Sequence, residues 1–95
     1  MNVLLVSYDL RKPGQNYTGL IAELKACHSW WHYLKSTWLV VTDESPRDLT
    51  RRLRDHIDGN DRLLVVAIEH GAARQGWLPK RAWVWIEKKI GRPDA

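Results

Sequence analysis

Asp9 is the residue with the clearest chemical potential in this sequence of 95 residues. It ends an apolar run that begins at Val3, and a basic turn with a Pro-Gly pair, residues 11–14, follows it. An apolar run stopped by such a turn predicts a buried strand that delivers the carboxylate to a sheet edge, where a chemical site could form. The carboxylate could equally accept backbone N–H bonds within the turn. Asp9 therefore either belongs to a chemical site or caps a turn.

Positive charge is the second chemical feature, with a formal net charge of +4 and a pI near 9.5. Lysines and arginines that meet phosphates release counterions, so a basic protein favours polyanionic partners. Arg11 and Lys12 adjoin Asp9, and the segment 47–54 adds four arginines, among them Arg51 and Arg52. These four form either a solvated helix face that pairs with nearby aspartates or a phosphate-binding face.

Cysteine and histidine argue against other site chemistries. Cys27, the single cysteine, excludes an internal disulfide and indicates a reducing compartment. We interpret it as a small core residue. The four histidines lack the spacing of a zinc site. No apolar run approaches the ~20 residues of a membrane span, so we expect a cytoplasmic protein.

The apolar patterns predict one domain with alternating strands and helices. Strands are expected at 3–8, 31–34, 37–42 and 62–69, although 30–42 could be one kinked strand. Helices are expected at 17–27, after Ser45-Pro46 as far as 57, and from 78 to 90. This order predicts an α+β, ferredoxin-like βαββαβ sandwich with a four-stranded antiparallel sheet. The core would span 2–69, with a C-terminal helical extension at 78–91, all within a single domain of 1–95.

Both faces of the predicted strands are apolar, yet two helices on one face leave the other open. Either the C-terminal helix, through Trp83, Ile86 and Ile90, or a second copy of the chain must cover that open face. Trp85 lies away from the apolar side of this helix, so it is a candidate partner contact.

Three segments resemble a known family. Residues 3–10 (Val-Leu-Leu-Val-Ser-Tyr-Asp-Leu) resemble the opening strand of the CRISPR-associated protein two family and the related VapD ribonucleases. Residues 33–40 resemble that family's second and third strands, and residues 57–66 resemble its connection from the second helix to the fourth strand. The similarity covers about 2–69. The Trp-Trp pair and C-terminal helix extend a second resemblance, to small bacterial SinR-like proteins, over nearly the whole chain.

The resemblance implies a homodimer in which the sheets face each other and the two copies of Asp9 approach near the dimer axis. There Asp9 would hold a divalent metal, Mg²⁺ with Mn²⁺ as a substitute. Tyr8 would be its neighbour, and Ser36 and Trp38 would be the serine and aromatic of the third strand, with Ser36 beside Asp9 as a catalytic candidate. His32 stands where relatives have a basic residue and could contact phosphate.

The implied function is nucleic-acid processing by a metal-dependent endonuclease that acts on RNA or DNA as a dimer. The alternative is a non-catalytic, dimeric nucleic-acid-binding or assembly module that presents the arginines of 47–54. A third reading, a single-strand RNA binder, would need stacking aromatics on the central strands. If the C-terminal helix covers the face used for dimerisation, the two copies of Asp9 would be separated and the metal site lost.

Overall fold

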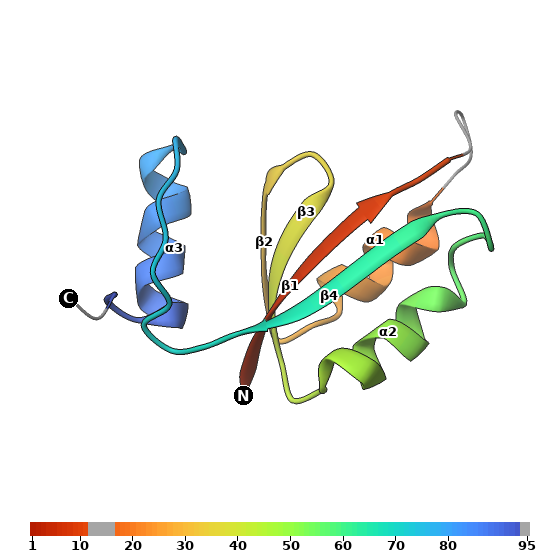
Figure 1. Cartoon of the computed structure of the whole chain (residues 1–95), viewed down its shortest axis with the longest axis horizontal. Helices are drawn as coiled ribbons and strands as arrows, with labels where there is room; N and C mark the ends of the chain where they lie inside the picture. Colours follow the sequence, from red (N-terminus) through yellow and green to blue (C-terminus); the bar gives the residue numbers. More distant parts are fainter. Residues whose placement is uncertain (12–16, 94–95) are drawn as a thin grey trace.

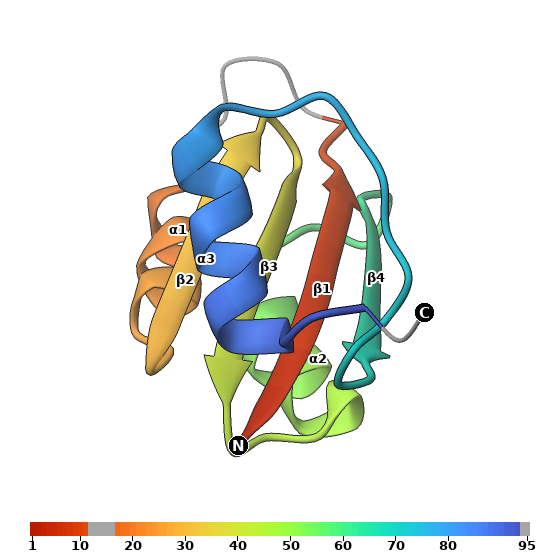
Figure 2. The same ribbon diagram turned by 90° about the vertical axis from the view of Figure 1, so that its left-hand side faces the viewer.

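The structure, a computed structural model, describes residues 1–11 and 17–93. The elements follow the order β1 (Asn2–Asp9), α1 (Thr18–Lys25), β2 (Ser29–Leu34), β3 (Thr37–Thr42), α2 (Pro46–Arg54), β4 (Arg62–Ile68) and α3 (Lys80–Ile90). The four strands form one antiparallel sheet in the order β2-β3-β1-β4. Helices α1 and α2 cover one face and α3 lies on the other (Figures 1 and 2). The predicted ferredoxin-like arrangement with an added C-terminal helix is confirmed.

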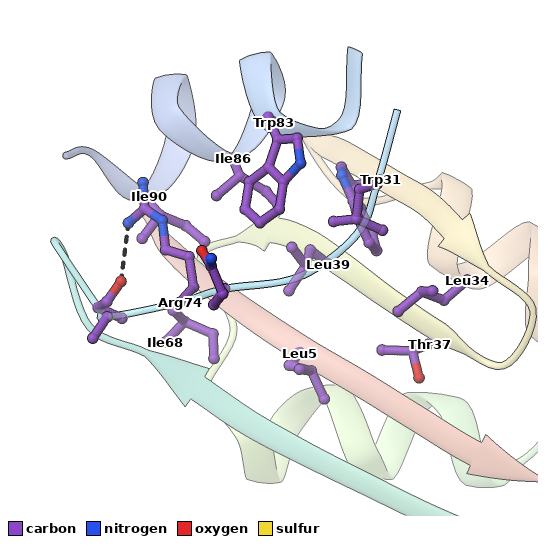
Figure 3. Close-up of a pocket in the computed structure, with 14 residues that line it drawn as sticks. Leu5, Trp31, Leu34, Thr37, Leu39, Ile68, Arg74, Trp83, Ile86 and Ile90 are labelled. Atoms are coloured by element: carbon purple, nitrogen blue, oxygen red, sulfur yellow. Dashed lines mark hydrogen bonds between the residues drawn. The ribbon is translucent and has the colours of Figure 1, made fainter. Parts of the chain in front are cut away.

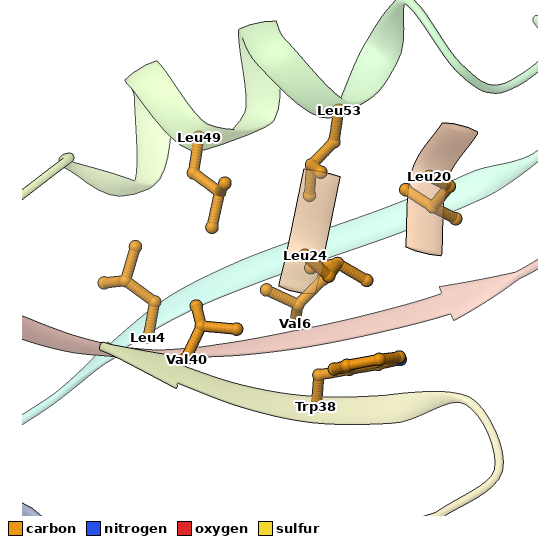
Figure 4. Close-up of a cluster of buried hydrophobic side chains, with 8 residues drawn as sticks. All are labelled: Leu4, Val6, Leu20, Leu24, Trp38, Val40, Leu49 and Leu53. Atoms are coloured by element: carbon orange, nitrogen blue, oxygen red, sulfur yellow. The ribbon is translucent and has the colours of Figure 1, made fainter. Parts of the chain in front are cut away.

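The face under α1 and α2 holds the main core (Figure 4). Successive side chains of a strand point to opposite faces, so Leu4 and Val6 of β1 point toward the two helices and are fully buried. Burying a side chain of this size contributes about 1.5–3 kcal/mol. Eight fully buried residues make up this core: Leu4, Val6, Leu20, Leu24, Trp38, Val40, Leu49 and Leu53.

Helix α2 begins as the sequence predicts. The Oγ of Ser45 accepts a hydrogen bond from the backbone N–H of Asp48 at 3.1 Å, and Pro46 occupies the first turn. The helix ends at Arg54, three residues before the predicted end. The backbone N–H groups of His56 and Ile57 donate to the carbonyl oxygens three residues earlier, those of Leu53 and Arg54, which closes the last turn. Helix α1 likewise ends at Lys25, two residues early, so Cys27 follows the helix and packs against the core.

Residues 29–42 form two strands, which excludes one continuous kinked strand. Strands β2 and β3 make a hairpin that turns at Lys35 and Ser36, with a register shift between Trp31 and Leu34. The predicted second strand therefore begins two residues early, at Ser29.

Helix α3 packs on the opposite face of the sheet, over Trp31 of β2 and Leu39 of β3 (Figure 2). The indole N–H of Trp31 donates to the carbonyl oxygen of Ala82 at 3.2 Å. The indole N–H of Trp85 donates to Ser29 Oγ at 3.1 Å. The prediction that Trp85 lies away from the packed side of this helix is wrong, because its side chain joins the helix to β2.

The covering of this face is incomplete. On β4 the side chains of Leu64 and Val66 remain 58% and 41% exposed.

The described part of the chain contains no helix that is both long enough and apolar enough to cross a bilayer.

Candidate functional site

The end of β1 brings several of the predicted site residues to one edge of the sheet. Asp9 lies opposite Arg62 of β4 in the strand register, and the backbone N–H of Tyr8 donates to the carbonyl oxygen of Ser36 at 3.0 Å. We call this region the sheet end and define it by Asp9, Arg11, Ser36 and Arg62. A depression of about 280 Å³ lies here between β1 and β4, lined by Ser7, Tyr8, Asp9, Arg62, Leu63 and Leu64.

Asp9 itself stands in solvent. Its carboxylate pairs with the Arg11 guanidinium at 3.4 Å, and the two side chains are 66% and 55% exposed. An exposed pair of this kind contributes about 0–1 kcal/mol to stability, because water competes for both charges. Among the described residues, this weak and exposed pair leaves the Asp9 carboxylate accessible to a ligand.

Asp61, which sequence reasoning missed, is the carboxylate that organises this corner. It is only 6% exposed, and Oδ1 accepts the backbone N–H of Arg11 at 2.7 Å. Its Oδ2 accepts the backbone N–H of Asp58 at 2.8 Å, and the Tyr17 hydroxyl donates to both oxygens. The signal in the sequence is the Asp-Gly-Asn-Asp turn at 58–61, where short acidic side chains bond to nearby backbone.

Tyr8 and Trp38 lie on the other face of the sheet from Asp9. Trp38 is fully buried in the main core, and its indole N–H donates to the Tyr8 hydroxyl at 3.0 Å. The exposed His32 ring stacks on Trp38 with ring centroids 3.9 Å apart, and its Nε2 lies 3.0 Å from the carbonyl oxygen of Lys35. The structure thus separates these three aromatic side chains from the Asp9 carboxylate. Ser36 is half-buried and adjoins the sheet end through its backbone.

The arginines of α2 divide into two groups. Arg52 points inward, where its guanidinium donates to the carboxylates of Glu23 on α1 and Glu44 before α2. These bonds lower the pKa of both glutamates and raise that of Arg52. Arg52 therefore links α1, α2 and the β3–α2 loop, with its polar groups already engaged.

Arg47, Arg51 and Arg54 remain exposed on α2. Their spacing of four and three residues places them along one stripe of the helix. Among the residues that the structure describes, no carboxylate forms an ion pair with any of them, so the expected pairing to Asp48 and Asp55 is not seen.

Arg62 joins this stripe to the sheet end. Arg54 and Arg62 line the same depression of about 260 Å³, and Arg62 also borders the depression that holds Asp9. We call Arg47, Arg51, Arg54 and Arg62 the arginine surface. Lys12, the other predicted phosphate contact, lies outside the described residues.

The donor set for a metal ion is small. No group of three or more His, Cys, Asp or Glu side chains suited to a metal occurs within residues 1–11 and 17–93. At the sheet end one chain offers Mg²⁺ the single carboxylate of Asp9, so a two-carboxylate site requires a second chain. Mg²⁺ commonly uses one or two protein carboxylates, so a single chain supplies the minimum and a dimer would supply two.

Strands β1 and β3, whose residues are all described, present Val3, Leu5, Ser7, Thr37, Leu39 and Val41 to the α3 side. They offer no aromatic platform for stacked bases there.

Comparison with known proteins adds no assignment: no protein-family model, curated protein or solved structure matches this chain.

Proposed function

We propose that this protein binds nucleic acid through its phosphate backbone, as a dimeric binding or assembly module. The observation that carries the proposal is the arginine surface, in which three exposed α2 arginines without carboxylate partners in the described structure continue to Arg62 at the sheet end. Arg11 pairs with Asp9, which lines a depression together with Arg62. The inward Arg52 provides an internal contrast, because its charge is already neutralised by two glutamates.

Electrostatics sets the expected behaviour of such a surface. If the four arginines each meet one phosphate of a duplex, the logarithm of the binding constant falls with the logarithm of the salt concentration with a slope of about −3.6. Backbone contacts carry little sequence information, so different duplexes of equal length are expected to bind alike.

The test compares two double charge reversals by fluorescence anisotropy with a labelled duplex. Arg51→Glu with Arg54→Glu should abolish binding at moderate salt, and the milder change of both residues to Gln should reduce the salt slope by about two. Arg81→Glu with Lys88→Glu, exposed on α3, makes the same change in net charge elsewhere. The proposal would be contradicted if both double variants lost the same amount of duplex affinity, or if the unmodified chain did not bind the duplex.

A metal-dependent endonuclease that cleaves RNA or DNA is the second candidate. The observation in its favour is the exposed Asp9 carboxylate in a depression beside Arg62. When bound, Mg²⁺, or Mn²⁺ in its place, would polarise a phosphate and lower the pKa of a water. Asp9 from each of two chains would hold the ion, Arg11 and Arg62 would bind the flanking phosphates, and Ser36 borders the same edge.

This candidate depends on a homodimer that leaves α3 in place. Helix α3 covers the β2 and β3 part of the face, so it obstructs a fully face-to-face pairing of sheets. The uncovered strip on β4, with Leu64 and Val66, adjoins Asp9 and is where a second copy would pack.

A cytoplasmic location is in keeping with the free thiol of Cys27.

Incubation of labelled RNA and DNA with the protein and Mg²⁺ or Mn²⁺ tests cleavage. Asp9→Asn should abolish it, while Asp43→Asn, at another exposed aspartate, should leave it unchanged. Cleavage that survives Asp9→Asn excludes this mechanism. Binding without cleavage would leave the first proposal standing.

A further inference from the structure

A cavity of about 330 Å³ lies between α3 and the sheet (Figure 3). Leu5 of β1 and Leu39 of β3 form its floor, and Trp83 and Ile86 of α3 form one wall. The segment 69–79, which runs beside α3 on the same side of the sheet (Figures 1 and 2), supplies the opposite wall. The cavity shares no lining residue with the depression at the sheet end.

Hydrogen bonds at both ends of α3 hold this space open. At the C-terminal end, the backbone N–H of Gly71 donates to the carbonyl oxygen of Ile90 at 2.8 Å, and Arg74 donates to the carbonyl oxygens of Ala72 and Gly91. Near the N-terminal end, the bond from Trp31 to Ala82 fixes the helix to β2. The helix and the 69–79 segment are thus fixed to each other and to the sheet by polar contacts, which do not require a filled interior.

The lining defines the ligand chemistry. It is almost entirely apolar, and it includes two indole rings, the buried Trp31 and the half-buried Trp83. Arg74 carries the only charge among the described residues that line the space. An apolar cavity of about 150 Å³ accepts benzene, so roughly twice that volume suits two fused rings.

We propose that the cavity is a binding site for a small aromatic carboxylate of about two rings. The rings would lie between the sheet floor and Trp83. The carboxylate would accept hydrogen bonds from those of the five Arg74 N–H donors that do not bond to Ala72 and Gly91. The site is independent of the proposed nucleic-acid surface, because neither its residues nor its ligand class overlap with those of the arginine surface.

Calorimetric titration of the full chain with 2-naphthoate tests the proposal. We expect saturable one-to-one binding, accompanied by a change in tryptophan fluorescence because two indoles line the site. Leu5→Trp and Ala72→Phe, which add bulk from the floor and from the opposite wall, should each weaken binding at least tenfold. Val84→Trp adds the same bulk on the exposed side of α3, outside the cavity, and should change nothing.

The uncharged 2-naphthamide tests the role of Arg74. The unmodified chain should prefer the carboxylate by about tenfold, since hydrogen bonds to charged groups are the stronger ones, and Arg74→Gln should remove that preference. The ratio of the two affinities is unaffected by a general loosening of the fold. Absence of saturable binding, undiminished binding in both filled variants that circular dichroism shows to be folded, or an unchanged preference in Arg74→Gln would overturn the proposal.

Discussion

The two faces of the sheet are packed in different ways. Under α1 and α2, eight side chains are fully buried and interlock between helices and strands (Figure 4). Under α3, a cavity of about 330 Å³ remains and two apolar residues of β4 stay exposed. The first face is the more tightly packed, whereas the second combines a smaller buried cluster with polar anchors at the ends of α3. Space for a ligand or a second chain is therefore found on the second face.

Truncation of a core leucine should have the largest effect. Leu24→Ala, in the fully buried cluster, is expected to lower the free energy of unfolding by about 3–5 kcal/mol, because it leaves a cavity that tightly packed neighbours cannot fill. Ile86→Ala on α3 should cost closer to 2 kcal/mol, because its side chain already borders empty space. Urea unfolding of both variants measures the difference, and equal losses would show that the two faces are packed alike.

Removal of the Arg52 charge should have an intermediate effect that depends on pH. Arg52→Met leaves Glu23 and Glu44 without their partner and should lower the melting temperature at pH 7 by roughly 5 °C. Arg51→Met, at an exposed position on the same helix, is the matched control and should leave it nearly unchanged.

The pH dependence follows from the direction of the two carboxyl pKa shifts. Both glutamates have a pKa below their usual 4.5 in the folded chain, so their contribution is fully present above pH 4.5 and is lost as the pH falls through the folded pKa. The difference between the unmodified chain and Arg52→Met should therefore shrink in melts below about pH 4. A constant difference from pH 7 to pH 3 would contradict this account.

The smallest change in stability is expected on the uncovered strip. Leu64→Lys should alter the free energy of unfolding by no more than about 0.5 kcal/mol, since the side chain is 58% exposed. Sedimentation equilibrium should nevertheless show weaker self-association than in the unmodified chain if β4 is the dimer surface. If the protein self-associates and Leu64→Lys does not weaken that association, the interface lies elsewhere.

The order of elements was predictable because it depends on local patterns. Apolar alternation marks the strands, and the Ser45-Pro46 pair starts α2 where the structure has it. Helix ends were less predictable, since their last turns depend on which carbonyls the following residues reach. At His56 the bond to Leu53 ends α2 before the apolar spacing would.

The side-chain partners could not be predicted in the same way. Arg52 is separated from Glu23 by 29 residues, and nothing in its helix distinguishes it from the exposed Arg51. Asp61, rather than Asp9, accepts the backbone N–H of Arg11, and Trp85 bonds to Ser29 across 56 residues. Such pairs depend on how the elements pack in three dimensions. The same holds for the cavity, which exists only where α3 and the 69–79 segment lie side by side on the sheet.

Strand β4 has a consequence for how the protein behaves at high concentration. It forms an outer edge of the sheet, and residues 63–68 contain neither a charge nor a proline that would discourage pairing with another edge. At low salt the net charge of +4 keeps copies apart, and added salt screens that repulsion. Salt should therefore promote association along this edge while it weakens binding to nucleic acid, so one salt titration distinguishes the two kinds of complex.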